Sequence, residues 1–244
     1  MAELMSPHIL LFMLATFAGA LVAGVGGFAF GLVASALWLH VITPAQSAPL
    51  IAAFAIVIQG WAVWKLRRAI DPRQLLPLLA GAAVGIPLGT AALRWLPAAE
   101  LRIFIGVFMI AFVIYSLARP KLRPIEGGPL SDGLVGIVSG VLGGSAGLGG
   151  IPTTIWTTQR GWPKDKQRAV FQPTALAIFV MTLVWFGGAG ILTRDTVHLF
   201  LIGLPPLLLG TWLGLTLYGR LDDTTFRKVV LILLLISGVA LVVA

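Results

Sequence analysis

Apolar residues run along this chain in long segments, and short polar stretches separate them. From Leu4 to Trp64 the sequence contains no Asp, Glu, Lys or Arg. Because a membrane-spanning helix needs about 20 apolar residues, this stretch alone is long enough for two or three spans. Eight apolar segments can be drawn along the whole chain, at residues 6–39, 46–64, 74–95, 99–118, 130–158, 169–190, 196–219 and 225–243. The pattern predicts an all-α, polytopic membrane protein.

The composition agrees with a membrane protein. Of the 244 residues, 58% are hydrophobic and only 11% are charged, whereas a soluble domain carries about 25% charged residues. We assign the net charge of +8 to cytoplasmic loops and not to nucleic-acid binding, because no run of Lys and Arg alternates with aromatic residues. The chain has no cysteine, which excludes disulfides and thiolate metal sites. The expected partners are a lipid bilayer and a small solute, with no nucleic acid, metal or cofactor.

Glycine interrupts two of the apolar segments. Residues 140–153, GVLGGSAGLGGIPT, contain six glycines, and residues 23–31, AGVGGFAFG, are a shorter stretch of the same kind. Glycine lowers helix propensity and leaves backbone N–H groups accessible. At membrane depth, non-helical backbone is tolerated only where protein or a water-filled cavity surrounds it. Each break is therefore a candidate substrate site.

The two halves of the chain resemble each other. In their later parts, four residues match at an offset of 125, namely Gly85, Gly89, Leu96 and Arg102 with Gly210, Gly214, Leu221 and Arg227. In their earlier parts, four residues match at an offset of 117, namely Gly19, Ala23, Gly26 and Gly27 with Gly136, Gly140, Gly143 and Gly144. We predict one transmembrane repeat at residues 1–118, a cytoplasmic linker at 119–132 and a second repeat at 133–244.

Loop charge indicates that the repeats are inverted. Loops 65–73 and 159–168 are strongly positive, and they occupy non-equivalent positions in the two repeats. If positive loops are cytoplasmic, the repeats face opposite ways, which requires an odd number of crossings in each. Segments 6–39 and 130–158 would then be glycine-broken re-entrant or discontinuous hairpins, each followed by three transmembrane helices. The alternative is eight plain spans, and the sequence leaves it open.

Several aromatic and small residues have simpler interpretations. Tryptophans near predicted helix ends are expected at the membrane interface, and these are Trp38, Trp95, Trp162 and Trp212. Glycines at a spacing of four fit a ridge for close helix packing, and these are Gly81, Gly85 and Gly89 with Gly136, Gly140 and Gly144. A buried serine or threonine also commonly bonds the backbone of its own helix.

The candidate binding residues are neutral donors at the glycine breaks. Helix N-termini there would point N–H groups and positive dipole ends at an anion, and nearby hydroxyl and amide groups would add donors. The candidate set is Gly26, Gly27, Gly144, Ser145, Gly147, Gly149, Gly150, Thr153, Thr154, Gln172 and Thr174, with Phe28 and Arg168 as candidate mouth or gate residues. No catalytic residue is predicted, because HExxH, Ser/Lys and Ser/His pairs and acidic pairs at depth are all absent.

The second glycine-rich motif resembles the sulfite exporter TauE/SafE family of membrane permeases. The matching stretch is residues 147–174, GLGGIPTTIWTTQRGWPKDKQRAVFQPT, and residues 26–48 are its weaker partner. The first half departs from the pattern, since no proline stands where Pro152 stands in the second. The resemblance implies transport of small anions, notably sulfite and organosulfonates, across the cytoplasmic membrane.

We therefore expect a secondary transporter of small sulfur-containing or carboxylate anions that acts mainly as an exporter. An importer of the same solutes and an anion channel are the alternatives within transport. A membrane-embedded enzyme and an assembly factor are the rival classes. The oligomeric state is open, and a homodimer is one arrangement that the sequence allows.

Overall fold

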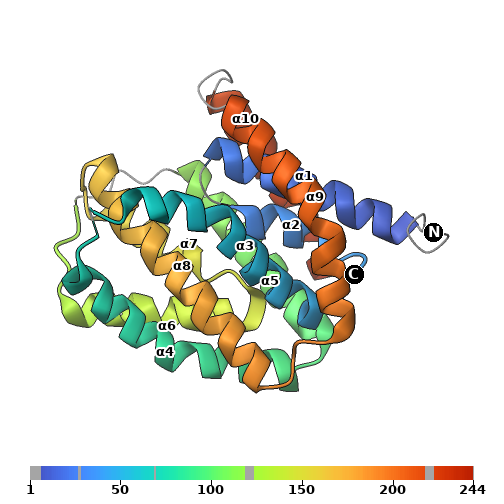
Figure 1. Ribbon diagram of the computed structural model, residues 1–244, viewed down its shortest axis with the longest axis horizontal. Helices are drawn as coiled ribbons and strands as arrows, with labels where there is room; N and C mark the ends of the chain where they lie inside the picture. The colour runs from blue at the N-terminus through green and yellow to red at the C-terminus, as the bar shows by residue number, and fades with distance from the viewer. Residues whose placement is uncertain (1–6, 27–28, 69, 119–123, 218–222, 244) are drawn as a thin grey trace. The chain divides into compact units, whose positions relative to one another are not determined.

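The structure is a computed structural model that describes residues 7–26, 29–68, 70–118, 124–217 and 223–243 (Figure 1). Within these ranges the chain is helical and has no strand, as the apolar pattern predicts. The helices are α1 (Pro7–Gly26), α2 (Phe30–Trp38), α3 (Pro44–Leu66), α4 (Pro72–Trp95), α5 (Ala98–Ala118), α6 (Pro129–Ala146), α7 (Gly150–Gln159), α8 (Lys164–Gly188), α9 (Arg194–Leu217) and α10 (Asp223–Val243).

Local sequence explains where these helices begin and break. Pro44, Pro72 and Pro129 each occupy the first position of a helix, where the missing N–H costs nothing. At α4 the side chain of Asp71 also caps the helix by accepting the N–H of Arg73 at 3.0 Å. The two glycine-broken segments are each divided into two helices, α1 with α2 and α6 with α7.

Several helices have the length and composition of membrane spans. Among the described residues five helices qualify, at Pro7–Val25, Pro72–Trp95, Ala98–Ala118, Asp165–Gly188 and Arg194–Leu217. Large apolar side chains are exposed along them, including Leu88, Val184 and Leu209. Exposed apolar surface on this scale needs a partner, and a lipid bilayer provides it. The protein is therefore a multi-pass membrane protein.

The chain forms two compact units, and each unit takes helices from both halves of the sequence. The first unit comprises residues 1–47, 97–120 and 194–244, and the second comprises residues 48–96 and 121–193. The first thus contains α1, α2, α5, α9 and α10, and the second contains α4, α6, α7, α8 and most of α3. The predicted sequence repeats are a different division of the chain and stay a prediction. Residues 119–123 of the predicted linker lie outside the described residues.

A ridge of glycines joins α4 to α6 in the second unit, where the two helices lie side by side (Figure 1). A Cβ added to Gly81, Gly85 or Gly89 would overlap a backbone carbonyl oxygen of α6, those of Gly133, Ile137 and Val141 respectively. The partners advance along both helices together, so α4 and α6 run parallel. The predicted packing role of these glycines is confirmed, because only glycine allows two backbones to approach so closely.

The first unit repeats this arrangement between α1 and α9. A Cβ on Gly210 would lie 2.5 Å from the carbonyl oxygen of Phe17, and one on Gly214 would overlap that of Leu21. From the other side, a Cβ on Gly24 would lie 2.8 Å from the carbonyl oxygen of Thr211. The same unit pairs α5 with α10, where a Cβ on Gly106 would lie 2.7 Å from the carbonyl oxygen of Gly238.

Each glycine-broken segment folds back on itself as a hairpin. In the first unit the indole N–H of Trp38, at the end of α2, donates to the carbonyl oxygen of Phe12 in α1 at 3.3 Å. The rings of these two residues stack with their centroids 5.0 Å apart. Trp38 is fully buried, so its predicted place at the membrane interface is wrong; the hairpin encloses it. Trp95 and Trp212 are mostly exposed, as an interfacial position requires.

The hairpin of the second unit closes in the same way. The indole N–H of Trp156 in α7 donates to the carboxylate of Asp132 near the start of α6 at 2.7 Å. Arg160, just after α7, lies 3.8 Å from the same carboxylate. The N–H of Ile125 donates to the carbonyl oxygen of Gln159 at 3.0 Å. The start of α6 and the end of α7 therefore meet at one end of the unit.

Candidate functional site

The candidate site is the tip of the α6–α7 hairpin, residues 147–149. Helix α6 stops at Gly147, whose φ of 73° lies in the left-handed region that favours glycine. Its N–H still donates to the carbonyl oxygen of Gly143 at 2.9 Å, and the N–H of Leu148 donates to that of Leu142 at 3.0 Å. The chain then reverses, and α7 begins at Gly150. The tip is buried within the unit.

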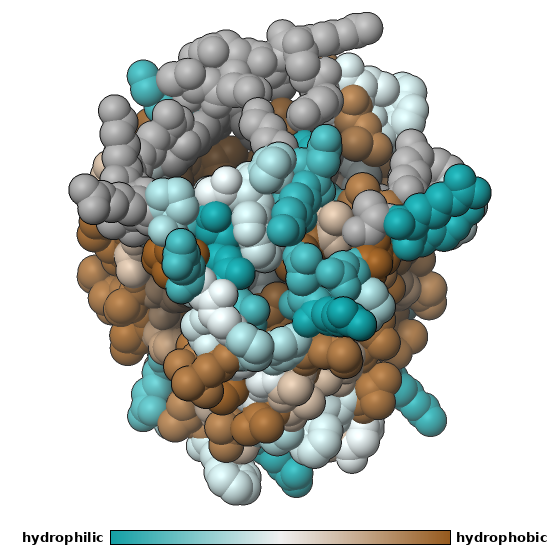
Figure 2. Space-filling view, turned by 90° about the vertical axis from the view of Figure 1, so that its left-hand side faces the viewer, coloured by the Kyte–Doolittle hydropathy of each residue, from teal (hydrophilic) through white to brown (hydrophobic). Residues whose placement is uncertain are grey.

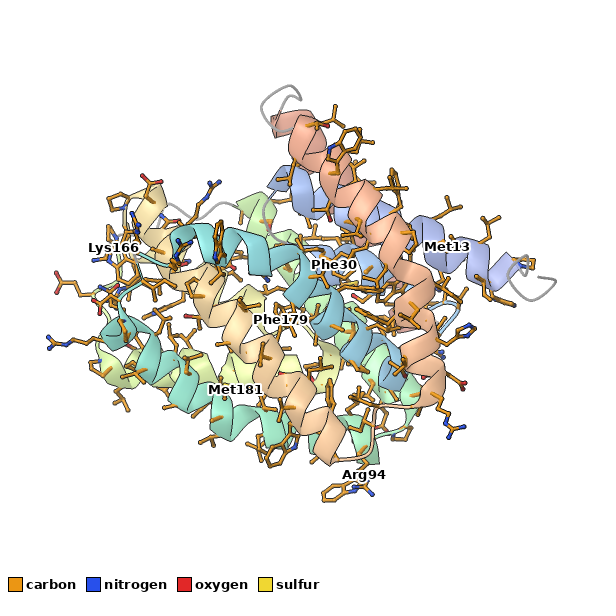
Figure 3. The ribbon with its side chains drawn as sticks, viewed as in Figure 1. Met13, Phe30, Arg94, Lys166, Phe179 and Met181 are labelled. Carbon is orange, nitrogen blue, oxygen red and sulfur yellow. The ribbon has the colours of Figure 1, made fainter. Side chains whose placement is uncertain are left out.

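The tip glycines fit closely against α3, α6 and α8. A Cβ on Gly147 would lie 2.7 Å from the carbonyl oxygen of Ala48 in α3. One on Gly149 would lie 2.7 Å from a methyl carbon of Ile178 and 2.8 Å from the carbonyl oxygen of Ser139. Gly150 faces Phe179, which Figure 3 shows midway along α8. The tip of the hairpin thus lies between helices, at the depth where α8 is apolar.

The predicted hydroxyl ligands all bond the backbone of their own helices. Ser145 donates to the carbonyl oxygen of Val141 at 2.7 Å, and Thr174 donates to that of Val170 at 2.8 Å. Thr153 and Thr154 both donate to the carbonyl oxygen of Gly150, at 2.9 and 2.7 Å. In this arrangement their hydrogens are used internally, and their remaining lone pairs can only accept hydrogen bonds.

The other predicted residues are more scattered. Gly144 faces α4, where its Cβ would overlap the carbonyl oxygen of Ile86, so it lies on the packing ridge and away from the tip. Gln172 is buried in α8 next to Pro173, and Arg168 is exposed near the start of that helix. Gly26 is the last residue of α1. Gly27 and Phe28 lie outside the described residues.

Two buried hydroxyls near the tip were not predicted from the sequence. Ser139 in α6 and Thr182 in α8 are fully buried, and in the part of the chain that the structure describes neither side-chain oxygen has a hydrogen-bond partner. A third such hydroxyl, that of Thr90, lies in α4. The available sequence signal was weak: each is a single hydroxyl residue in an otherwise apolar window, as are many residues that simply bond their own helix.

Cationic side chains gather at the end of the second unit where the hairpin closes. Apolar contacts between residues at the starts of α4 and α8, such as Leu78 with Val170, bring both of these helix starts to that end, together with Val135 and Trp156. Figure 3 shows Lys166 there, and Figure 2, which views this side, shows hydrophilic side chains gathered on it. Among the side chains that the structure describes, the exposed cations of the adjoining loops and helix ends are Arg67, Arg68, Arg73, Lys166 and Arg168.

Arg160 is held among aromatic rings at this cationic end. Its guanidinium carbon lies 4.8 Å from the ring centre of Trp162 and 5.6 Å from that of Trp156. The ammonium of Lys166 lies 4.6 Å from the ring centre of Trp162. These cation–π contacts and the carboxylate of Asp132 fix the base of the hairpin.

A polytopic helical bundle in which broken helices place their interrupted backbone inside the protein is the architecture of membrane transport proteins. The comparison with protein families agrees with this class. The model of the family described as Sulfite exporter TauE/SafE matches residues 11–241, nearly the whole chain. The protein belongs to the sulfite exporter TauE/SafE family, as the sequence motif at the tip predicted. Comparisons with curated proteins and with solved structures gave no match. Membership indicates a membrane transporter and suggests sulfite or a related sulfur-containing anion as its solute.

Proposed function

We propose that the protein is a secondary transporter that exports sulfite, organosulfonates or related small anions across the cytoplasmic membrane. The observation that carries this proposal is the buried tip of the α6–α7 hairpin. There α7 begins at Gly150 inside the second unit, so its N-terminal dipole and N–H groups act where the dielectric is low. An anion of two or three oxygens suits several neutral donors, and neutral donors release it more readily than a fixed cation would.

The donors at this helix start can be named. The N–H of Ile151 bonds the carbonyl oxygen of Leu148 at 3.2 Å, and Pro152 has no N–H. The N–H groups of Gly149 and Gly150 are the donors that we assign to the anion. Gly149 also has a packing reason to be glycine, because an added Cβ would lie 2.7 Å from a methyl carbon of Ile178.

We further propose that α6 and α7 form a re-entrant hairpin that enters from the cytoplasmic side. Both of its ends lie at the cationic end of the second unit, and positive loops are cytoplasmic. Eight plain spans would instead put residues 125–132 and 159–168 on opposite sides of the membrane. The hydrogen bond from Trp156 to Asp132 favours the hairpin.

The inverted repeat gains support from equivalent contacts in the two units. Gly210 meets the carbonyl oxygen of Phe17 as Gly85 meets that of Ile137, and Gly214 meets that of Leu21 as Gly89 meets that of Val141. The equivalent residues of α4 and α9 are 125 positions apart in the sequence, as predicted, whereas those of α1 and α6 are 120 positions apart. We therefore replace the predicted offset of 117 for the earlier parts with 120. Helices α2 and α7 begin 120 positions apart as well.

Export needs no ion coupling when the cell interior is negative. Each unit charge that leaves gains about 2.3 kcal/mol per 100 mV. We therefore propose uniport or exchange without a buried carboxylate relay. Flux in proteoliposomes that required a pH gradient but no voltage would contradict this mechanism.

Transport is tested by measuring the flux of radiolabelled sulfite and methanesulfonate in proteoliposomes for wild type and Gly147→Ala. The substitution strains a left-handed residue and crowds the carbonyl oxygen of Ala48, so the tip shifts and flux should fall at least tenfold. Gly190→Ala is the matched control, because Gly190 has a φ of 71° with no atom within 4 Å of an added Cβ. Equal flux in the two variants would remove the tip from the mechanism.

Orientation is tested with one engineered thiol, since the chain has no cysteine. Asp165→Cys places the thiol at an exposed position in the first turn of α8, next to the loop that follows α7. In intact cells an impermeant maleimide should leave it unlabelled, and in inside-out vesicles the reagent should label it. Labelling in intact cells would contradict the cytoplasmic hairpin.

A further inference from the structure

The inference concerns Ser139 and Thr182, two fully buried residues near the tip whose hydroxyls have no hydrogen-bond partner among the described residues. A buried polar group that makes no hydrogen bond costs about 1–3 kcal/mol, so each such group requires an explanation. The simplest remedy for a helical serine or threonine is a bond to a carbonyl oxygen of its own helix. In the same unit Thr157 and Thr174, which are equally buried, do this at 3.0 and 2.8 Å. Ser139 and Thr182 do not.

Both residues lie next to the tip of the hairpin. Thr182 points at α6, since its hydroxyl oxygen lies 3.2 Å from a Cβ added to Gly143. Ser139 lies one turn before Gly143, on the same face of α6, and its carbonyl oxygen lies 2.8 Å from a Cβ added to Gly149. Ile178, one turn before Thr182 on α8, touches both of these glycines. The hydroxyl of Thr182 and the backbone of Ser139 therefore flank the place where the tip, α6 and α8 meet.

Two glycines leave room at this place, because neither α6 nor the tip places a side chain there. A Cβ at Gly143 in α6 would stand against the hydroxyl oxygen of Thr182, and one at Gly149 in the tip would stand against the backbone of Ser139. The hydroxyls of Ser139 and Thr182 would add two neutral donors to the N–H groups of Gly149 and Gly150 that we assign to the anion.

We propose that Ser139 and Thr182 bind the transported oxyanion by donating their hydroxyl hydrogens to two of its oxygens. This proposal rests on the transport function proposed above and adds residues that determine its specificity. Hydroxyl donors with no adjacent cation favour a solute with several oxygens, such as sulfite or a sulfonate head group, over a halide, which offers a single centre. They also exclude a cationic solute, because the N–H groups at the helix start repel it.

Among the described residues of the first unit, the counterpart of Ser139 is not a hydroxyl donor. At the offset of 120 the counterpart of Ser139 is Gly19, and the ring of Phe30 lies 3.3 Å from a Cβ added there. Phe30 also contacts the ring of Trp38 edge-on, with centroids 5.9 Å apart. The equivalent position is thus filled by aromatic carbon, and we assign one oxyanion site to each chain.

The test compares hydroxyl-deleting variants in proteoliposomes loaded with radiolabelled sulfite. Ser139→Ala and Thr182→Val should each raise KM about tenfold, because each removes one hydrogen bond to a charged ligand. Thr157→Val is the matched control, since its hydroxyl is equally buried and already bonded, and its KM should equal that of wild type. Thr182→Ser should recover most of the affinity that Thr182→Val loses.

The outcomes separate this inference from the proposed function. If wild type transports sulfite and the two deletions change only thermal stability, the hydroxyls hold a structural water or nothing, and the inference is overturned while the transport function stands. If wild type transports neither sulfite nor methanesulfonate, the transport function fails. Binding then decides the inference: sulfite should raise the melting temperature of wild type but not of the Ser139→Ala/Thr182→Val double variant. An equal rise in both proteins would overturn it.

Discussion

Single backbone positions determine where the two hairpins turn. Gly147 ends α6 with a positive φ, as glycine usually does. Ala29, just before α2, has a φ of 78°, and an alanine pays about 1–2 kcal/mol for that conformation. Ala29 is therefore a strained position next to α2, whereas Gly147 adopts its conformation without such a cost.

The strain at Ala29 predicts that Ala29→Gly stabilises the protein. Removing the Cβ relieves the left-handed penalty, and the gain should be up to about 1 kcal/mol after the entropy cost of glycine. Thermal unfolding in detergent, followed by intrinsic fluorescence, measures the change. Ala29→Val should destabilise, because a branched side chain tolerates this conformation least; a lower melting temperature for Ala29→Gly would contradict the assignment.

At this scale the sequence predicted some features and missed others. Glycine clusters revealed the break at Gly147, because few other residues adopt its backbone conformation. The conformation of Ala29 was not predictable, since alanine carries no left-handed preference. The hydroxyls of Ser139 and Thr182 were missed for a related reason: whether a serine or threonine bonds its own helix depends on its rotamer and neighbours, which composition does not reveal.

Helix pairs depend on glycine where their backbones touch. The α4–α6 pair predicts that Gly85→Ala destabilises the protein by at least about 1–3 kcal/mol, the usual cost of overpacking, because the new methyl would overlap the carbonyl oxygen of Ile137. Gly60→Ala in α3 is the control, as no atom lies within 4 Å of its added Cβ and alanine favours a helix. Its melting temperature should equal or exceed that of wild type. A Gly85→Ala protein as stable as the control would disprove the close contact.

The base of the α6–α7 hairpin makes a second prediction at this scale. Trp156→Phe keeps an aromatic ring but deletes the indole N–H that donates to the carboxylate of Asp132. The free energy of unfolding should fall by about 1.5–3 kcal/mol, because the lost hydrogen bond has a charged acceptor. Asp132→Asn keeps an acceptor oxygen for Trp156 and loses the charge near Arg160, so it should cost less. Melting temperatures of the two variants decide the order, and an Asp132→Asn protein that is less stable than Trp156→Phe would show that the ion pair dominates.

Helix positions followed from the apolar pattern because lipid imposes a minimum length on each span. The pairing of the helices could not be predicted from the sequence, because a ridge of glycines on α4 does not indicate that α6 is the helix that packs against it. The prediction of packing ridges was confirmed, and Gly144, which was expected both on a ridge and in the binding site, faces Ile86 of α4. Glycines at a spacing of four show that one face of a helix has small residues, but they do not show which residues pack against that face.

Each compact unit of the protein contains helices from both halves of the chain. We predict that neither half is stable alone and that the two together reassemble. If the chain is divided in the connector between α5 and α6, each separately expressed half should be degraded, because α4 lacks α6 and α1 lacks α9. Co-expressed halves should copurify on a tag carried by one of them. A first half that is stable and monodisperse by itself would contradict this.

The distance along the chain between α1 and α9 also bears on how the protein is made. Helix α9 begins about 170 residues after α1 ends, so at typical rates of about 5–20 residues per second the ribosome needs on the order of 10–30 s to supply it. During that interval the glycine face of α1 has no native neighbour within the nascent chain. An insertase or chaperone that shields small-residue helices would then limit the yield of this protein, more than the rate of translation itself.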